Sequence, residues 1–294
     1  MSNMCPACLN NDTIVYSSKP TDFEEYATNY SQFQLNRCRT CSCIFLHPPP
    51  TIADTRNFYP SDYMSLKKSP LLFKAMFAIW IQVLAKKTVS NLGTNTRLLD
   101  YGCGEGQFMD QLKKAGATSI CGFEPMRGSD DSRGIYTEIS QLPLGFFDVI
   151  FMRDVLEHLT DVDQTMTSLR SLLRPGGKVL IETPNAAHFS VSIFKDLWGG
   201  LHFPYHTAIF SPTSIQISYL RWGFNRVHII PNFFPGMWAM SFQNLIKLKR
   251  RQRGRMALYP FILLLSAPFW LLDYFWAKMT HSHSSHIKCE LLID

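Results

Sequence analysis

The sequence predicts an α/β fold with a parallel sheet and a small metal-binding module at its N-terminus. From residue 97 onward, short apolar runs alternate with helical stretches, as in RLLDY, FMDQLKKAGA and FFDVIFM. Apolar strands separated by helices indicate βαβ units whose sheet is covered on both faces. A second observation is a pair of C-x-x-C motifs before residue 47. The third is size, because 294 residues with 46% hydrophobic content suffice for one domain and a small attachment.

Residues 1–47 form the expected metal module, a zinc ribbon. Strand-like TIVYSS (13–18) lies between its two cysteine pairs. Four thiolates are the tetrahedral set that a structural zinc ion prefers. The two pairs supply Cys5, Cys8, Cys38 and Cys41. Cys43 is close enough to compete with Cys41 for the metal, so the fourth ligand stays open. Thiols used in this way, behind an N-terminus without a signal-peptide pattern, predict a reducing, cytoplasmic location.

Residues 48–94 are expected to hold a linker and a helix. Three consecutive prolines at 48–50 cannot continue a helix or a paired strand, so they mark a boundary. The run 71–89 contains no proline or glycine and is apolar around most of its circumference. We expect a helix there that packs against the core or another apolar surface.

Residues 95–230 hold the expected α/β core, and residues 285–294 alternate well enough to add a closing strand. Strand-like RVHII (226–230) is the last element before a long interruption. Within the core, the Arg-Pro-Gly-Gly stretch at 174–177 is expected to end a helix, because glycine tolerates the left-handed conformation past a helix end.

Residues 231–284 form an insertion between those two strands. It contains KLKRRQRGR (247–255), with six basic residues, followed at 256–272 by a run without any charge. The run is shorter than the roughly 18 to 20 residues of a spanning helix and contains prolines, so a transmembrane span is not expected. Cations before an apolar, aromatic-rich run are typical of an interfacial anchor. An anionic membrane surface and a peripheral location are therefore expected; the alternative is a cationic surface stretch followed by a core helix.

The stretch LLDYGCGEGQF (98–108) ends a strand with glycines at alternate positions, Gly102, Gly104 and Gly106. A strand that ends in Gly-x-Gly and leads into a helix brings backbone N–H groups close to a ligand. A dinucleotide turn needs G-x-G-x-x-G facing a pyrophosphate, whereas Asp100 and Glu105 place carboxylates here. Carboxylates attract a ligand with sulfonium and ammonium groups. This disfavours a dinucleotide oxidoreductase. Glu124, at the end of SICGFEP, has the spacing of an acid that accepts both ribose hydroxyls of an adenosine.

Four stretches, LLDYGCGEGQF, GFEP, FFDVIFMRDVLEHL and LLRPGGKVLIETPN, occur in the order and spacing of the class I S-adenosylmethionine-dependent methyltransferases. The resemblance covers about residues 95–230 and is greatest to the branch with ubiquinone-type and polysaccharide-cluster enzymes. The N-terminal cysteine stretch resembles a zinc-binding module found ahead of some of them. The likeness implies a Rossmann-like, doubly wound, mostly parallel seven-stranded sheet with S-adenosylmethionine as cofactor. It also implies site roles: Asp100, Gly102 and Gly104 at the methionine part, with Gly106 completing the turn, Glu124 at the ribose, Glu138 at the adenine, and Asp154 and His158 near the methyl group.

Methyl transfer from a sulfonium to oxygen releases a neutral leaving group, so such an enzyme needs a base more than an oxyanion hole. Histidine titrates near neutral pH, and the candidates are His158, His202 and His206. The stretch 202–224 resembles the family's segment between the fifth strand and the last helix, which favours His206, with His158 beside it. A purely structural hydrogen-bonding role is the alternative for each.

The sequence therefore predicts an S-adenosylmethionine-dependent methyltransferase acting on an oxygen of a sugar, glycan-related or lipid-linked small molecule. The main rival is an rRNA base methyltransferase, which the net charge of +6 permits. The stretch TPN (183–185) differs from the Asn/Asp-Pro-Pro-aromatic motif of amino-group nucleic-acid enzymes, so nucleic acid is the less favoured partner. A second rival is a non-catalytic module in which the zinc ribbon and the basic segment recruit partners, and the intact glycines and acids disfavour it.

Overall fold

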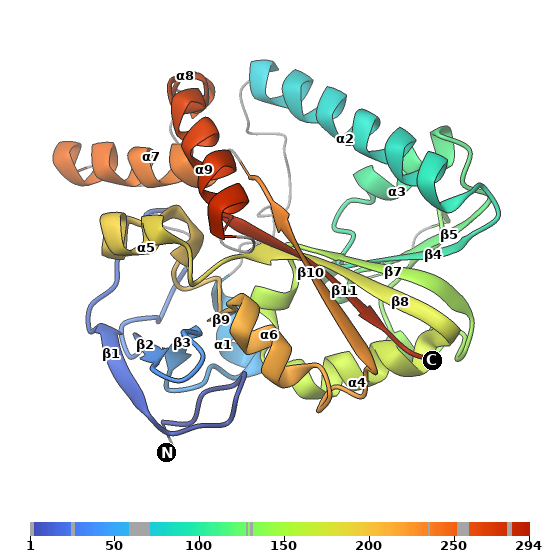
Figure 1. Ribbon diagram of the computed structural model, residues 1–294, viewed down its shortest axis with the longest axis horizontal. Coiled ribbons are helices and arrows are strands. Elements are labelled where there is room, and N and C mark those ends of the chain that lie inside the picture. Colours follow the sequence, from blue (N-terminus) through green and yellow to red (C-terminus); the bar gives the residue numbers. More distant parts are fainter. Residues whose placement is uncertain are drawn as a thin grey trace.

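The centre of the structure is a seven-stranded sheet in the order β10-β11-β8-β7-β4-β5-β6 (Figure 1). The computed structural model describes residues 3–24, 27–58, 71–127, 129, 132–234, 236–251, 259–280 and 284–294. The parallel strands are β4 (Arg97–Tyr101), β5 (Ser119–Phe123), β6 (Ile135–Tyr136), β7 (Phe147–Arg153) and β8 (Leu173–Pro184). The antiparallel strands at the other edge are β11 (His286–Leu292) and β10 (Arg226–Asn232). The predicted fold class, a mostly parallel Rossmann-like sheet, is confirmed.

The order of the strands defines where a ligand is expected. The chain places β5 and β6 on one side of β4 and then returns to place β7 on its other side. Ligands of open α/β sheets bind outside the carboxyl ends of the strands at such a switch point. The glycine-rich turn follows β4 directly, so the turn lies at this point.

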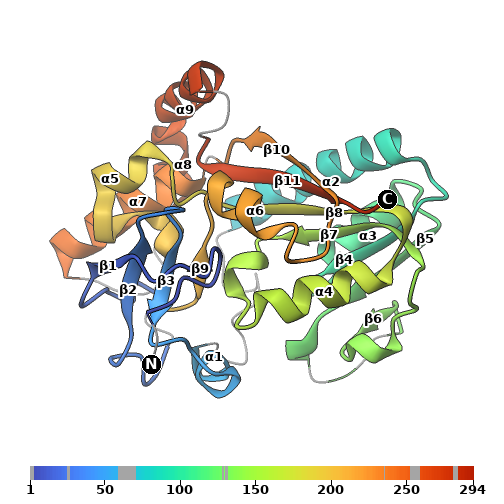
Figure 2. The same cartoon turned by 60° about the horizontal axis from the view of Figure 1, so that its bottom comes forward.

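Helices cover both faces of the sheet (Figures 1 and 2). On one face lie α2 (Leu71–Leu92) and α3 (Gln107–Lys114), and on the other lie α4 (Val162–Leu172) and α6 (Pro212–Ser218). Successive residues of a strand point to opposite faces. Accordingly Leu98 packs in the core under α2 and α3, whereas Leu99 packs in the core under α4 and α6. The apolar runs in the sequence are therefore strands buried on both sides.

Helix α2 is buried on one side only. Ile81, Ala85 and Val89, four residues apart, are at most 6% exposed and pack against α3 and the sheet. Ile79 and Val83 on the same helix are 63% and 60% exposed. The helix expected over 71–89 is present, but it leaves much of its apolar circumference uncovered.

The Arg-Pro-Gly-Gly stretch at 174–177 does not end a helix, and that expectation was wrong. Helix α4 ends at Leu172, and β8 already begins at Leu173. Gly176 has φ 73°, so the left-handed conformation is used inside the strand. Regular pairing of β8 with β7 resumes at Lys178, which pairs with Val149 of β7.

A second, antiparallel sheet holds the N-terminal module. Its strands, in spatial order, are β1 (Thr13–Ser17), β2 (Gln34–Cys38), β3 (Ile44–His47) and β9 (Ala208–Ile209). Helix α1 (Ile52–Phe58) follows β3 in the chain. The last strand comes from the core, where Ile209 pairs with Ile44. The module is thereby joined to the segment that follows β8, and its cysteines pack in the same core as Phe210 and Trp222.

The insertion between β10 and β11 is helical. It consists of α7 (Gly236–Arg250), α8 (Tyr259–Leu265) and α9 (Ala267–Thr280). Part of the basic run and the start of the apolar run, residues 252–258, lie outside the described residues. None of the helices in the described ranges combines the length and the apolar content that crossing a bilayer requires. The expectation that 256–272 does not form a single spanning helix agrees with this.

Candidate functional site

The turn after β4 brings backbone groups to the carboxyl edge of the sheet. The N–H groups of Gly102 and Cys103 both donate to the carbonyl of Phe123, at 2.8 and 3.1 Å. Gly102 has φ 76°, and a Cβ there would lie 2.4 Å from Cγ2 of Val155. Only glycine combines this left-handed backbone with so close a neighbour. The turn therefore requires glycine at this position, where it packs against the loop that carries Val155.

Glu124 is held at the same edge by backbone donors. Its Oε2 accepts from the N–H of Gly104 at 3.0 Å, and its Oε1 accepts from the N–H of Met126 at 3.1 Å. Arg127, in the short helix η2 (Pro125–Arg127), donates to the carbonyl of Gly104 at 3.2 Å. Both carboxylate oxygens are fixed, and each retains a lone pair for a further donor.

Asp100 is the second carboxylate of the turn and is 5% exposed. Burial raises its pKa to about 6; the positive charge of Arg153 opposes the shift and the negative charge of Glu124 adds to it. Buried like charges favour a cationic ligand between them. Glu105, which the sequence placed beside Asp100, is exposed, so that part of the expectation was wrong. The acidic character of the turn comes from Asp100 and Glu124.

The loop after β7 places more polar groups at this edge. Asp154 has φ 52° and donates its N–H to the carbonyl of Glu182 at 2.8 Å. Its Oδ1 lies 3.1 Å from Nε2 of His286, the first residue of β11. The loop also carries Val155, the neighbour of Gly102. Asp154 is thus tied to the closing strand beside the glycine turn.

A buried cluster of imidazoles and a carboxylate follows in the same loop. Single ligand atoms of Glu157, His158 and His206 all lie within 4.8 Å of one another. His158 belongs to the short helix η4 (Leu156–His158), and His206 comes from the segment after η6 (Gly199–Leu201). The rings of His158 and His206 meet edge to face at 4.7 Å. The two predicted base candidates are therefore neighbours.

Hydrogen bonds orient this cluster, which we call the histidine cluster (Glu157, His158, His206). Nδ1 of His158 lies 3.0 Å from the carbonyl of Tyr205, and Nδ1 of His206 lies 2.8 Å from the carbonyl of Gly200. A carbonyl oxygen only accepts, so in each neutral ring the proton is on Nδ1 and Nε2 is the basic nitrogen. Burial lowers the pKa of both rings. Both imidazoles are neutral at pH 7 and can accept a proton.

Glu157 is fully buried, and its Oε2 accepts from the hydroxyl of Thr183 at 2.9 Å. Its Oε1 has no hydrogen-bond partner among the residues that the structure describes. Burial raises the pKa of this carboxyl well above its ordinary value, and the charge of Asp154 adds to the shift. A protonated carboxyl or a ligated cation would each satisfy the second oxygen. Two imidazoles and a carboxylate are ligand types of divalent cations.

The structure separates the sequence-predicted residues into two groups. Asp100, the glycines and Glu124 surround the turn, and Asp154, His158 and His206 lie on the adjoining loops. Glu138 is exposed, and its contacts form a capping box at η3 (Ile139–Gln141) after β6. His202 contacts the ring of His206 at 5.0 Å, and burial lowers its pKa to about 4.

Sequence reasoning missed Glu157, His286 and Arg153. Glu157 stands directly before His158 in LEHL, so its position was a usable signal. Arg153 pairs with Glu182 at 3.1 Å and lies over the ring of Phe108, and its charge lowers the pKa of Asp100. His286 looks like an ordinary strand residue in the sequence, because it meets Asp154 132 positions away in the chain.

The four predicted metal ligands converge. Sγ atoms of Cys5 and Cys41 are 3.6 Å apart, those of Cys8 and Cys38 are 3.5 Å apart, and all four lie within 4.8 Å of one another. A Zn–S bond of about 2.3 Å in a tetrahedron places sulfurs roughly 3.8 Å apart. The fifth thiol, Cys43, is fully buried and points to the carbonyl of Ile44 at 3.9 Å. The geometry therefore fits a zinc site with four thiolate ligands, of which Cys41 is the fourth.

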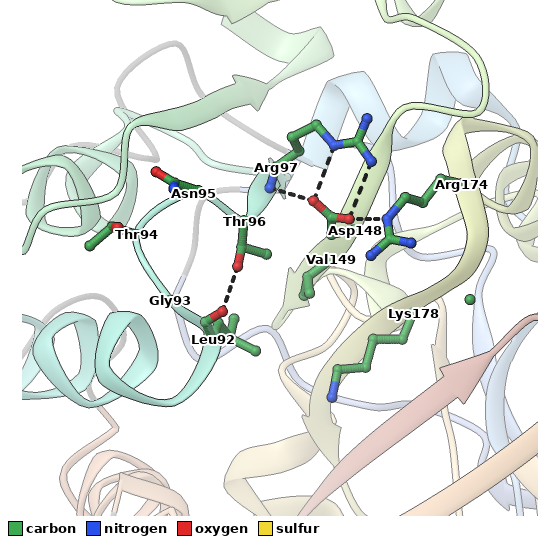
Figure 3. Close-up of a pocket in the computed structure, with 11 residues that line it drawn as sticks. Leu92, Gly93, Thr94, Asn95, Thr96, Arg97, Asp148, Val149, Arg174 and Lys178 are labelled. Carbon is green, nitrogen blue, oxygen red and sulfur yellow. Dashed lines mark hydrogen bonds and ion pairs between the residues drawn. The ribbon is translucent and has the colours of Figure 1, made fainter.

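A depression of about 750 Å³ lies at the opposite, amino-terminal edge of the strands (Figure 3). Its central acid is Asp148, which accepts from the N–H of Arg97 at 2.7 Å and from both arginine side chains beside it, Arg97 and Arg174. Burial by itself would raise the pKa of Asp148, but these hydrogen bonds and ion pairs lower it to about 2. The paired carboxylate ties β4 to β7 and has a structural role, and the hollow lies away from the glycine turn.

Comparison with known proteins identifies the family of the chain. A family model described as "Methyltransferase domain" matches residues 73–229, more than half of the chain. The chain belongs to this methyltransferase family. The match includes β4 to β8, the glycine turn and the histidine cluster.

The curated relatives of this methyltransferase match a shorter stretch. This chain is 31% identical over 106 residues to the ubiquinone biosynthesis O-methyltransferase of Rhizobium etli and 28% identical over 102 residues to that of Rhodopseudomonas palustris. These matches cover 30% of this chain and 41% and 40% of the relatives, so the chain spans about two fifths of their length.

Solved structures with a similar fold include a SAM-dependent methyltransferase from Archaeoglobus fulgidus, with TM-score 0.46 and 15% identity. It covers 75% of this chain and 98% of that one. A methyltransferase from Thermotoga maritima has TM-score 0.45 and 14% identity, and covers 76% and 96% of the two chains.

Proposed function

We propose that this member of the methyltransferase family transfers a methyl group from S-adenosylmethionine to an oxygen of a small acceptor, a sugar, glycan-related or lipid-linked molecule. The observation that carries the proposal is the pair of buried carboxylates, Asp100 and Glu124, at the switch point of the sheet beside the glycine turn. Two carboxylates close together suit a sulfonium and an ammonium group and repel a pyrophosphate.

The residues of the turn fit the cofactor. A Cβ at Gly102 would collide with Val155, so the turn keeps this shape only while glycine stands there. Glu124 has a fixed carboxylate with lone pairs for ribose hydroxyls, and Asp100 has a buried charge for the aminoacyl end. When bound, S-adenosylmethionine supplies an electrophilic methyl group with a neutral leaving group.

The chain's own contribution to the chemistry is to position the acceptor and to take its proton. His206 is the proposed base, because its Nδ1–H is held by the carbonyl of Gly200 and its Nε2 is left as the acceptor. His158, at 4.7 Å between ring centroids, is the proposed second histidine of the acceptor side. Positioned acid–base groups contribute roughly 10²- to 10⁴-fold in rate.

The metal and the location belong to the same proposal. We assign a structural zinc ion to Cys5, Cys8, Cys38 and Cys41, which fits their spacing. The domain division, with a ribbon over 1–47 and a core over 95–230 closed by 285–294, remains the proposed one. A cytoplasmic location, peripheral at an anionic membrane surface, follows from the sequence pattern. The rRNA and non-catalytic alternatives remain rival predictions, and no contact in the described residues favours either.

Calorimetric titration of the purified protein with S-adenosylhomocysteine and, separately, with NAD tests the cofactor assignment. We expect micromolar binding of the first and none of the second. A protein that binds neither ligand, or only NAD, would contradict the assignment.

The base is tested with His206→Ala, with His228→Ala as the matched control because His228 is exposed on β10. Acceptors to screen are a catechol, a nucleotide sugar and a polyprenyl-linked sugar. We expect His206→Ala to lose turnover by about 100-fold or more while keeping its affinity for S-adenosylhomocysteine. Turnover equal to that of the control would remove His206 from the mechanism.

A further inference from the structure

Helices α8 and α9 carry an apolar outer face. In α9, Leu271, Leu272, Phe275 and Met279 are 61%, 54%, 60% and 78% exposed. Their spacing of three to four residues places them on one side of a helix. On α8, Phe261, Leu264 and Leu265 continue the apolar exposure at 59%, 54% and 77%. We call these seven residues the apolar face.

The inner side of α8 and α9 is packed against the protein through polar and apolar residues. Asp273 of α9 is 2% exposed, and its Oδ1 lies 2.8 Å from Nε2 of the buried His188. Phe269 stacks on Trp238 of α7 with ring centroids 5.0 Å apart. Water-soluble helices usually bury their apolar stripe and expose polar residues. Here Ile262 and Ala277 are buried in this way, but seven large apolar side chains remain exposed as well, so the outward apolar face belongs to helices whose inner side is already packed.

Cations lie at the end of the neighbouring helix. Lys249, Arg250 and Arg251 are exposed at the end of α7, the helix that packs against α8. Lys247, counted with them in the sequence, is fully buried and bonds Glu24 at 2.9 Å, so it belongs to the interior. Figure 1 shows α8 at the upper margin of the molecule, with α9 running from it toward the centre, and α2, with its own exposed Ile79 and Val83, at the upper right.

We propose that the apolar face docks on an anionic lipid surface, with α9 lying in the plane of the interface. The described helices cannot span a bilayer, whereas a short helix with one apolar face and nearby cations sinks to the acyl boundary. A second copy of this chain would bring the same cations to the contact. Anionic headgroups over an acyl layer match both the charge and the apolar area.

Docking of the apolar face on a lipid surface also indicates the class of methyl acceptor, an inference that rests on the proposed function. The insertion is bound to the segment that carries the base, because Gly199 donates its N–H to the hydroxyl of Ser241 in α7 at 2.9 Å. That segment runs on through Gly200 to His206, whose Nδ1 bonds the Gly200 carbonyl. The histidine cluster is thus fixed relative to the membrane-facing helices. The substrate class that fits this placement is a lipid-linked acceptor reached from the bilayer.

Vesicle co-sedimentation of the full chain tests the docking. The probes are vesicles of phosphatidylcholine alone and of phosphatidylcholine mixed with phosphatidylglycerol. We expect binding to the mixed vesicles, and a Phe275→Glu, Met279→Glu double variant that binds at least about thirtyfold more weakly. Leu144→Glu is the matched control, because Leu144 is 75% exposed and lies between β6 and β7. Wild-type protein that stays in solution, or a double variant that sediments like wild type, would overturn the proposal.

The charge is tested separately with Lys249→Gln, Arg250→Gln. Since two cations near an anionic surface are removed, we expect partitioning about thirtyfold weaker on the mixed vesicles. Gel filtration tests whether a second copy of the chain covers the apolar face instead. If the wild-type protein is a dimer and the Phe275→Glu, Met279→Glu variant is a monomer, the face belongs to a dimer interface and the lipid assignment is overturned. Titration with S-adenosylhomocysteine runs in parallel. If the protein binds S-adenosylhomocysteine but not vesicles, only the docking proposal is refuted. If it binds vesicles but not S-adenosylhomocysteine, only the cofactor site is refuted.

Discussion

Replacing Glu124 with glutamine changes one atom of the proposed cofactor site. In the native chain each carboxylate oxygen accepts one backbone N–H, from Gly104 at 3.0 Å and from Met126 at 3.1 Å. Glutamine keeps one acceptor oxygen and turns an NH2 group toward the other donor. One hydrogen bond to a charged group is lost, and two donors then face each other in a site that is 8% exposed.

The size of the effect follows from those contacts. Hydrogen bonds to charged groups contribute roughly 1.5 to 3 kcal/mol each. Losing one of them in the apo protein lowers the melting temperature by about 4 °C or more. On the ligand side, weaker acceptance of a ribose hydroxyl by a neutral amide costs about 2 kcal/mol, which corresponds to a Kd roughly thirtyfold higher.

Calorimetry with S-adenosylhomocysteine measures the Kd, and thermal unfolding measures the stability. The control is Glu105→Gln, one residue from Gly104 in the chain but exposed, and we expect both of its values within about twofold or 1 °C of wild type. A Glu124→Gln variant that binds with the wild-type Kd would refute the ribose role. If only the melting temperature fell, Glu124 would be a structural residue of the turn.

Three further outcomes are expected. The pKa of Asp100 is about 6 in the folded protein. Since its charged form binds the cationic end of the ligand, affinity for S-adenosylhomocysteine falls about tenfold per pH unit below pH 6; calorimetry across pH checks this, and a flat profile would exclude Asp100. In Gly102→Ala the added Cβ would lie 2.4 Å from Val155 on a backbone with φ 76°, so we expect a lower melting temperature and no ligand binding. Adding Val155→Ala to this variant should restore part of the stability. A double variant no more stable than Gly102→Ala would contradict the steric argument. Cys38→Ser removes a zinc ligand, and we expect bound metal to fall from about one per chain to well below one and turnover to drop more than affinity; unchanged metal content, measured by mass spectrometry, would refute the assignment.

The Cys38→Ser expectation has a structural basis in how the ribbon is attached. The hydroxyl of Ser211 donates to the carbonyl of Cys41, and that of Ser218 donates to the carbonyl of Ala7 at 2.8 Å. Tyr205, next to His206, donates its hydroxyl to Asp22 at 3.3 Å. The ribbon therefore supports the histidine cluster, whereas the glycine turn has its own contacts in the core. Loss of the metal should therefore loosen the histidine cluster more than the glycine turn.

Features within one stretch of chain could be predicted from the sequence. The glycine spacing after β4, the acid after β5 and the alternation of strands and helices are local, because backbone conformation and strand burial depend on nearby residue types. The two C-x-x-C pairs are also local, because each spans only four residues of the chain. The fold class followed from these patterns, and the cofactor half of the site stays a prediction made from them.

Contacts between distant stretches were decided only by the tertiary structure. Glu157 meets His206 because β9 pairs with β3 and the chain after β8 folds back over η4. His286 reaches Asp154 through the pairing of β11 with β8. Glu105 lies next to two site residues in the chain, yet the start of α3 turns it to solvent. Which side chain is buried beside which depends on the packing of whole elements, and residue types at short spacing carry no information on it.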